Sequence, residues 1–362
     1  MQAGFWQSLY IMSLTTSERC AGCLLGTAVG DALGLPYEGL SARRARRFFT
    51  DFSRHHLIMN HGMVSDDTEH AAFVAQALVR SRDDPVVFAR CLARSLRWWV
   101  LGLPAGVGFA TLRATLKLWL GFPPSKSGVY SAGNGPAMRS AIFGVVFAED
   151  HAKLKAFVKA STEITHRDPK AYFASLAVAV AAISGEATNN DWRSAYAQSL
   201  AQLIDGTGGD ELLALVARAR QSAEKGENVA DFAASIGSNN GISGYCYHTV
   251  PCVLQVWFRF GDDLEHGLAE ICGAGGDADT AGAIFGGIVG ARAGPEAINR
   301  EWLDRIWEWP RSIDWLERLG YALGDPANRR PPAYFWPAVV PRNLVFLSIV
   351  LAHGLRRLLP PY

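Results

Sequence analysis

The sequence predicts an all-α protein. Most segments longer than about 12 residues carry apolar side chains at the three- and four-residue spacing of an amphipathic helix. Runs in which apolar and polar residues alternate, as in a half-buried strand, are scarce. With 362 residues, of which 49% are apolar, the chain has enough material for one large domain or two modest ones.

The expected helices and breaks follow one another along the chain. Helical spacing is clearest in residues 71–82, 85–100, 154–164, 171–184, 212–225 and 264–272. Clusters of Gly, Pro, Ser and Asn predict loops at 121–124, 185–190, 206–209, 238–241 and 325–341. The final apolar segment, 343–359, is expected to form a helix docked on the body, with a dimer contact or a membrane-surface contact as alternatives.

Composition excludes several classes of protein. The 35 Lys and Arg residues are balanced by 34 Asp and Glu, so no surplus of positive charge indicates general binding to nucleic acid. The six cysteines are few for this length, and residues 1–15 lack the features of a secretory signal, so a reduced, cytoplasmic protein with free thiols is expected. The longest uncharged apolar stretches, 171–184 and 343–352, fall short of the roughly 20 residues that span a bilayer, and no transmembrane helix is expected.

Glycine recurs at four-residue intervals in two apolar segments that are otherwise compatible with a helix. These glycines are Gly22, Gly26, Gly30 and Gly34 in the first segment and Gly282, Gly286 and Gly290 in the second. Glycine inside a helix costs about 1 kcal/mol relative to alanine, and close approach of another backbone is the usual compensation. Both segments are therefore expected to be central helices.

Two short segments carry paired carboxylates just ahead of helical runs. They are Ser65-Asp66-Asp67-Thr68 and Gly276-Asp277-Ala278-Asp279-Thr280. One interpretation is helix capping, because Ser, Thr and Asp accept hydrogen bonds from the free N–H groups of a helix start. If the segments meet in space, four carboxylates crowd together and must take up protons or bind cations. Oxygen ligands would favour Mg²⁺ or Mn²⁺ over zinc.

Five motifs together resemble the ADP-ribosylglycohydrolase family. They occur in the family's order over residues 20–294 and comprise Gly26 to Gly34 with Pro36 and Glu38, Ser65 to Thr68, Gly133 to Arg139, Thr165-His166 with Pro169, and Gly275 to Thr280. The resemblance implies an all-α orthogonal helical bundle with a central dinuclear metal site. It also implies a hydrolase that cleaves the N- or O-glycosidic bond between ADP-ribose and a protein side chain or small acceptor.

The resemblance also assigns roles to individual residues. Two Mg²⁺ ions, or Mn²⁺, would be bound by Ser65, Asp66, Asp67, Asp277, Asp279 and Thr280. Glu38 matches a loop glutamate that serves some members as the catalytic acid or base, and Asp67 is the second choice. Glu38 can equally be a solvated loop carboxylate, and a water activated by the metals is a further candidate for the base.

Further motifs are assigned to the rest of the ligand. The glycines of Gly133-Asn134-Gly135 would let the backbone approach the diphosphate, with N–H groups at the start of the following helix pointing at it. His166 would lie near the phosphates, although a lone histidine is often structural. Ser243-Gly244-Tyr245 would flank the adenosine, where Tyr245 stacks on adenine or is simply a core tyrosine.

These expectations divide the chain into three parts. Residues 1–19 are expected to form an N-terminal extension, 20–300 the ADP-ribosylglycohydrolase-like domain, and 301–362 a C-terminal extension packed on the same body.

The function expected first is a Mg²⁺-dependent hydrolase that releases ADP-ribose. The alternatives are an inactive protein that binds metal and ADP-ribose, and a metal-dependent hydrolase of another substrate. Zinc at Cys20 and Cys23 is not expected, because small thiols suit the close packing of a glycine-striped helix.

Overall fold

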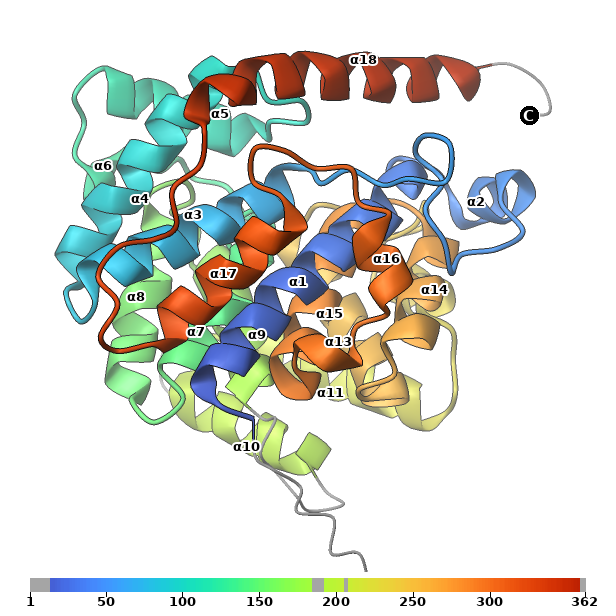
Figure 1. The fold of residues 1–362 in the computed structure, drawn as a ribbon. Coiled ribbons are helices and arrows are strands. Elements are labelled where there is room, and N and C mark those ends of the chain that lie inside the picture. Colours follow the sequence, from blue (N-terminus) through green and yellow to red (C-terminus); the bar gives the residue numbers. More distant parts are fainter. Residues whose placement is uncertain (1–13, 184–191, 205–207, 359–362) are drawn as a thin grey trace, which may run out of the picture.

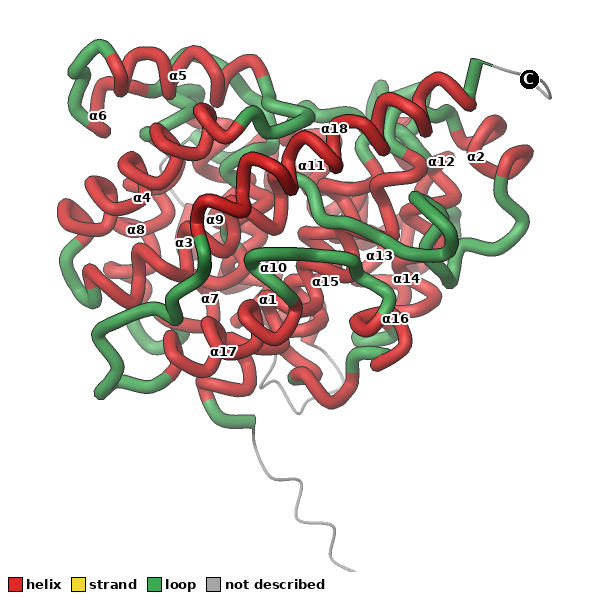
Figure 2. Tube along the Cα trace, turned by 45° about the horizontal axis from the view of Figure 1, so that its top comes forward, coloured by secondary structure: helices red, strands yellow, loops and turns green. Residues whose placement is uncertain are grey.

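The computed structural model describes residues 14–183, 192–204 and 208–358. Within these ranges the chain forms α-helices and short 3₁₀ helices, and its only β-type pairings are isolated bridges, which confirms the all-α prediction (Figures 1 and 2). The expected loop at 185–190, part of the one at 206–209, residues 1–13 of the N-terminal extension and residue 359 lie outside the described residues.

The helices expected from the sequence are found within about five residues of their expected positions, and further helices that were not placed individually, such as α5, α10, α13 and α17, lie between them. Their bounds are α1 Thr16–Gly34, α2 Ala42–Phe48, α3 Asp66–Ser81, α4 Pro85–Trp99, α5 Phe109–Trp119, α6 Pro124–Ser127, α7 Ala141–Val146, α8 His151–Glu163, α9 Pro169–Ile183, α10 Trp192–Ile204, α11 Asp210–Glu224, α12 Val229–Ser235, α13 Cys246–Phe260, α14 Leu264–Ala274, α15 Ala278–Ala293, α16 Arg300–Asp304, α17 Ile313–Gly324 and α18 Val339–Arg356. The 3₁₀ helices used below are η1 Leu35–Tyr37, η2 Val100–Gly102 and η3 Ala137–Arg139.

Helices α1 and α15 form the centre of the molecule and are packed against each other through their glycines. A Cβ atom at Gly26 would overlap the carbonyl oxygen of Gly286, and one at Gly30 would overlap that of Gly282. Almost every residue of both helices is buried. The prediction of two central, closely packed helices is confirmed, and it explains why glycine is used at a cost in helix propensity.

Other helices enclose this pair. Helix α17 packs on α1 through a second close approach, since a Cβ at Gly320 would overlap the backbone of Ala21. Helices α3, α7, α9, α13 and α14 pack on the other sides of α1 and α15. The amino ends of α3 and α15 carry the two carboxylate segments, so the packing of the centre brings those segments together.

Helix α18 runs along one edge of the molecule and contacts the body with one face (Figure 1). On that face Arg342 forms an ion pair with Glu308 (Nε–Oε1 2.8 Å, Nη2–Oε2 2.5 Å), and its Nη2 also donates to Val64 O (2.6 Å). Asn343 Nδ2 donates to Gly102 O (2.7 Å). These buried polar contacts dock the helix on the body.

The length of this helix differs from the sequence expectation. Residues Trp336–Arg356 form 21 continuous helical residues that contain an 18-residue window with a mean hydropathy of 1.6, enough by length and composition alone to cross a membrane. Only 17% of the tested window is buried. The expectation from uncharged runs missed it because Arg342 interrupts the apolar sequence.

Candidate functional site

Four loops meet at one end of the central helix pair and are joined by backbone hydrogen bonds. Gly39 N donates to Gly276 O (2.7 Å), and Gly276 N donates to Leu40 O (2.7 Å). Asn134 N donates to Gly244 O (3.0 Å). Gly276 has a positive φ of 77°, and a Cβ there would overlap the backbone of a neighbouring loop, so this position requires glycine. Loops distant in sequence are thereby fixed around one space.

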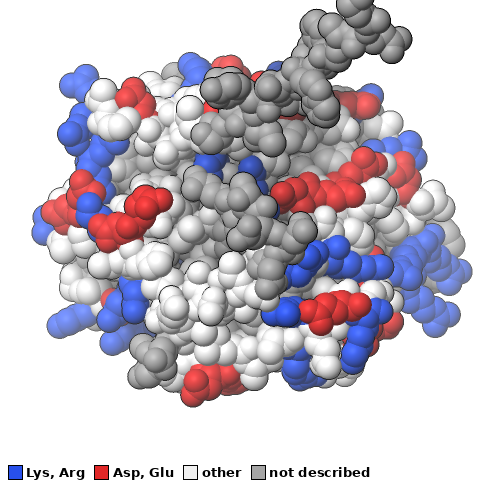
Figure 3. All heavy atoms as spheres, turned by 90° about the horizontal axis from the view of Figure 1, so that it is seen from below, with Lys and Arg blue, Asp and Glu red and all other residues white. Residues whose placement is uncertain are grey.

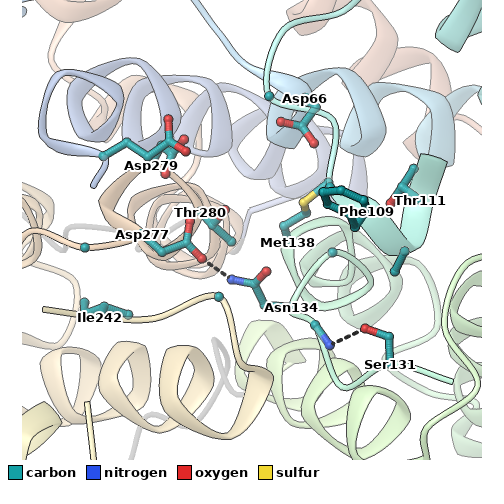
Figure 4. A pocket seen from close by; sticks show the side chains of 18 of the residues that line it. Asp66, Phe109, Thr111, Ser131, Asn134, Met138, Ile242, Asp277, Asp279 and Thr280 are labelled. Atoms are coloured by element: carbon teal, nitrogen blue, oxygen red, sulfur yellow. Dashed lines mark hydrogen bonds between the residues drawn. The ribbon is translucent and has the colours of Figure 1, made fainter. Parts of the chain in front are cut away.

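That space is a cavity of about 510 Å³, within the range typical of small-molecule sites (Figure 4). Its lining includes Glu38, Asp66, Phe109, Thr111, Gly133, Asn134, Gly135, Met138, His166, Gly244, Asp277, Asp279 and Thr280. In Figure 4 the carboxylates of Asp66 and Asp279 lie on opposite sides of the opening, and Asp277 lies near Asn134. Both carboxylate segments therefore contribute to one cavity.

The first segment forms the amino end of α3. Ser65 is the N-cap, and its Oγ accepts from Asp67 N (3.2 Å) and donates to Asp67 Oδ2 (3.0 Å). Asp31, from the last turn of α1, accepts from Ser65 N (2.9 Å) and from Thr68 Oγ1 (2.6 Å). The capping of α3 is thus performed by Ser65 and Asp31, which leaves the carboxylate of Asp66 facing the cavity.

The second segment forms the amino end of α15. Asp277 occupies the N-cap position, but its side chain caps nothing; its Oδ2 instead accepts from Asn134 Nδ2 (2.5 Å). Thr280 Oγ1 donates to Asp67 Oδ2 (3.3 Å), which links the two segments directly. Capping therefore does not account for the carboxylates of this segment.

The carboxylates perturb one another strongly. Burial first, and then the charges of Asp31 and Glu69, raise the pKa of Asp66 well above its usual value. Burial first, and then Glu38 and Asp277, do the same to the pKa of Asp279. Crowded carboxylates of this kind need protons or cations to offset their mutual repulsion.

Two observations bear on whether metal ions fit here. Asp67 Oδ1 and Asp279 Oδ1 are buried and have no hydrogen-bond partner, which leaves two acceptor oxygens uncompensated. Within the described ranges no three His, Cys, Asp or Glu side chains already stand close enough together to hold an ion. The oxygen-only donor set suits Mg²⁺ or Mn²⁺ in character.

Glu38 and Asp67 differ in access to the cavity. Glu38 follows η1, has an exposed side chain and belongs to the cavity lining. Although the residue is exposed, the cavity walls around its carboxylate exclude much of the water; this desolvation first, and then the charge of Asp277, raise the pKa of Glu38, while Arg357 lowers it. Asp67 is buried behind the lining and accepts bonds from Ser65 and Thr280.

Only some of the residues expected to bind the nucleotide line the cavity. Gly133, Asn134, Gly135, Gly244 and His166 line the cavity. Ser243 and Tyr245 are not in its lining: Ser243 Oγ pairs with His248 Nδ1 (2.8 Å), and Tyr245 Oη accepts from Lys170 Nζ (3.0 Å).

The glycine loop differs from its expected form. Gly135 is followed by the three-residue η3 and then the six-residue α7, so no long helix begins there. The Asn134 N–H, moreover, already donates to Gly244 O. The element that follows the glycine loop is thus a short 3₁₀ turn and not a long helix, and binding of the diphosphate by this loop stays a prediction.

Sequence reasoning missed two buried polar residues of the site. The sequence analysis assigns no role to Asp31, although a carboxylate inside an apolar helix needs partners, and that was the available signal. Arg139 is buried and donates to Ser161 O (2.9 Å) and Thr165 Oγ1 (2.9 Å). Burial lowers the pKa of Arg139 to about 9, and the charge of Asp66 opposes that shift. Burial, and then Arg139, lower the pKa of His166 to about 3, so His166 is neutral.

The cysteines lie away from the cavity. All six are free, and Cys20 and Cys23 are buried within α1. Burial raises the pKa of Cys20 to about 12, which leaves it a thiol. Their position in the closely packed helix fits the packing interpretation.

Comparison with known proteins finds one family across most of the chain. Residues 12–332 match the family described as ADP-ribosylglycohydrolase. An uncharacterised protein of Archaeoglobus fulgidus is 30% identical over 311 residues, which cover 84% of this chain and 96% of that protein. The ADP-ribosyl-[dinitrogen reductase] glycohydrolase of Rhodospirillum rubrum is 26% identical over 302 residues, covering 80% and 90%.

A solved structure agrees with the sequence matches. An ADP-ribosylglycohydrolase-related protein complex contains a chain that superposes with a TM-score of 0.62 at 28% identity, covering 86% of this chain and 98% of that one. Sequence and fold thus point to the same family. The match ends at residue 332, so α18 lies beyond it.

Proposed function

This protein belongs to the ADP-ribosylglycohydrolase family, and we propose that it hydrolyses the glycosidic bond between ADP-ribose and an acceptor, releasing ADP-ribose. The acceptor is a protein side chain or a small molecule. The observation that carries the proposal is the cavity itself, in which the two carboxylate segments, Glu38 and the Gly133–Gly135 loop converge.

The chemistry assigns a separate task to each side of the cavity. Cleavage at the anomeric carbon passes through an oxocarbenium-like state and needs a carboxylate that moves a proton. Glu38 is our choice, because its side chain is accessible from the cavity whereas Asp67 is buried behind it. Glu38 takes one proton from the attacking water as the water oxygen bonds to the anomeric carbon and the bond to the acceptor breaks. The leaving acceptor takes up one proton from solvent, and Glu38 then releases its own proton to solvent, which restores the carboxylate.

We propose that Ser65, Asp66, Asp67, Asp277, Asp279 and Thr280 bind two Mg²⁺ ions, or Mn²⁺. The unpartnered oxygens of Asp67 and Asp279 support this donor set. Bound ions supply positive charge that orients the ribose hydroxyls and acidifies water. Asn134 holds Asp277 in place through its amide.

The free thiols are compatible with a reducing compartment, and we include a cytoplasmic location in the proposal.

The test is release of free ADP-ribose from a panel of defined substrates, with and without EDTA. The panel contains ADP-ribose linked to arginine, to serine, to an acetyl ester and to a nucleobase. We expect turnover of at least one linkage and its loss in EDTA, restored by excess Mg²⁺.

Calorimetry with ADP-ribose distinguishes the alternatives. Binding of ADP-ribose without turnover of any linkage would identify an inactive binding protein. Neither binding nor turnover, with metal binding intact, would point to a hydrolase of another substrate.

A further inference from the structure

The outward face of α18 is apolar and is covered by no described part of the chain. It carries Val340, Leu344, Leu351, Leu355 and Leu358, which are between 41% and 65% exposed. The opposite face holds Arg342 and Asn343, whose buried bonds dock the helix. A continuous exposed apolar stripe of this kind is uncommon on a soluble protein and marks an interaction surface.

Large side chains extend the stripe at the amino end of the helix. Phe335 and Trp336 are 71% and 72% exposed. Two more leucines are exposed nearby: Leu101 in η2 and Leu103, which directly follows η2. The Asn343 bond to Gly102 O connects η2 to α18. Exposed Trp is typical of the boundary between water and lipid.

A cluster of arginines adjoins the other end of the helix. Helix α2 has the sequence Ala-Arg-Arg-Ala-Arg-Arg-Phe, and Arg44 Nη2 donates to Arg357 O (3.1 Å), which places α2 beside the carboxyl end of α18. Arg43, Arg46, Arg47 and Arg356 are exposed, and no carboxylate of the described residues lies within 4 Å of their charged groups.

Neither element contains an acidic residue. Both α2 and α18 are free of Asp and Glu, although the whole chain has a net charge of only +1. Figures 1 and 2 show α2 and α18 along the same edge of the molecule. The opposite face, in Figure 3, carries acidic and basic side chains next to one another. Helices α2 and α18 therefore carry basic side chains without acidic ones, whereas the opposite face carries both signs of charge.

We propose that α18 and α2 form a docking surface for an anionic lipid bilayer, with α18 lying in the plane of the interface. The leucines of the outward face enter the boundary of the acyl chains, and the arginines contact lipid phosphates. This inference is independent of the proposed catalytic function.

Two other uses of the helix fit less well. A membrane-spanning α18 would remove Arg342 from Glu308 and leave buried charges unpaired on both sides. A second copy of the chain, placed by two-fold symmetry, would present this same face, which offers the arginines no carboxylate. An anionic bilayer matches both the apolar stripe and the arginines.

The test is co-sedimentation of the full chain with vesicles of phosphatidylcholine alone or mixed with phosphatidylglycerol. We expect binding to the mixed vesicles, little to the neutral ones, and weakening as salt rises. The double variants Arg43→Gln/Arg47→Gln and Leu351→Ser/Leu355→Ser should each lower partitioning at least about tenfold.

Matched controls lie on α4, which is elsewhere on the surface. Arg90→Gln/Arg94→Gln and Val86→Ser change exposed residues of the same kinds and should leave partitioning unchanged. Melting temperatures confirm that each variant is folded.

Three results would overturn the proposal. One is equal binding to neutral and anionic vesicles, or none to either. Another is a dimer in light scattering that the leucine variants convert to monomer, which would assign the face to a second copy. The third is wild-type protein that resists both high salt and alkaline carbonate washes, which would indicate a spanning helix.

Discussion

Glu38 and Asp67 are both acidic, but their surroundings suit them to different roles. The exposed side chain of Glu38 lines the cavity from a loop, whereas Asp67 is buried and accepts bonds from Ser65 Oγ and Thr280 Oγ1. A side chain that already bonds to its neighbours in this way is suited to hold a fixed position. A loop carboxylate at the cavity is suited to exchange a proton with water or substrate.

Glu38→Gln separates these roles. The amide keeps the size of the side chain but is not basic, so turnover should fall by roughly 10²- to 10⁴-fold. ADP-ribose affinity should change much less, because a group that acts mainly in the transition state contributes little to ground-state binding. Single-turnover rates and ADP-ribose calorimetry on one sample measure both quantities. Near-normal turnover would transfer the role to Asp67 or to an activated water.

At this scale the sequence predicted chemistry better than position. It identified the two carboxylate segments, since paired acids beside helical runs exceed what a cap needs. It did not identify Asp31, whose partners, Ser65 and Thr68, are more than thirty residues away and become visible only when α1 packs on α3. It offered Tyr245 as a stacking partner for adenine or as a core tyrosine; the structure shows its hydroxyl bonded to Lys170, and the stacking role stays a prediction. Side-chain direction in a loop depends on tertiary contacts that a local motif does not encode.

Among the elements, the glycine stripe of α1 allows a direct test. Gly26→Ala should lower the free energy of unfolding by more than about 2 kcal/mol, because the new Cβ would overlap backbone rather than a movable side chain. Gly354→Ala is the matched control: it lies in α18 with no atom within 4 Å of the added Cβ. There the higher helix propensity of alanine should stabilise the protein by up to about 1 kcal/mol. Urea denaturation of both variants gives the comparison, and similar losses would refute the close-packing argument.

The end of α18 is expected to position the loop that carries Glu38. Arg357 donates to Glu38 O (2.6 Å) and to Pro36 O (2.6 Å). Arg357→Gln removes the two hydrogen bonds from the guanidinium to this loop. We expect kcat to fall about tenfold while KM changes little, because a displaced catalytic group slows the reaction without weakening substrate binding. Arg357→Lys should recover part of the loss. The exposed neighbour variant Arg356→Gln should behave as wild type on a soluble substrate, and an equal loss in both would show that α18 does not hold the loop.

The elements themselves were largely predictable because helical periodicity and loop-forming residues are local signals. Helices α3, α4, α8, α9, α11 and α14 begin and end within about five residues of the expected positions, close to the usual uncertainty of helix ends. The start of α18 was expected four residues too late, because the proline-rich stretch 325–341 predicted a loop, whereas Pro341 lies in the first turn of the helix, where proline is tolerated. Arg342 is a charge that the helix buries against Glu308, and only the fold shows that pairing.

For the molecule as a whole, repulsion within the carboxylate cluster destabilises one end of the central helix pair. Asp31, Asp66, Asp67, Asp277 and Asp279 all have pKa values raised by burial, and Asp31 reaches about 6. Because α1, α3 and α15 each contribute to the cluster, cations that neutralise it would stabilise the packing of the whole centre. Local metal binding should therefore be visible as global stability.

Ions that bind only the folded state stabilise it by mass action, by about 2.7 kcal/mol at a hundredfold excess over Kd. For a chain of this size, Mg²⁺ should then raise the melting temperature by about 3–6 °C over the same protein in EDTA. Asp279→Ala should abolish this rise in melting temperature. In EDTA the variant should melt only slightly below wild type, because the substitution leaves a small cavity but also removes the repulsion between Asp279 and the carboxylates of Glu38 and Asp277. Cys23→Ser, a buried change on α1 remote from the cavity, should lower the melting temperature in both conditions and keep the Mg²⁺ shift. Differential scanning calorimetry of the three proteins in EDTA and in Mg²⁺ measures all six values. A shift retained in Asp279→Ala would place the ions elsewhere, and a shift lost in Cys23→Ser would implicate the thiols.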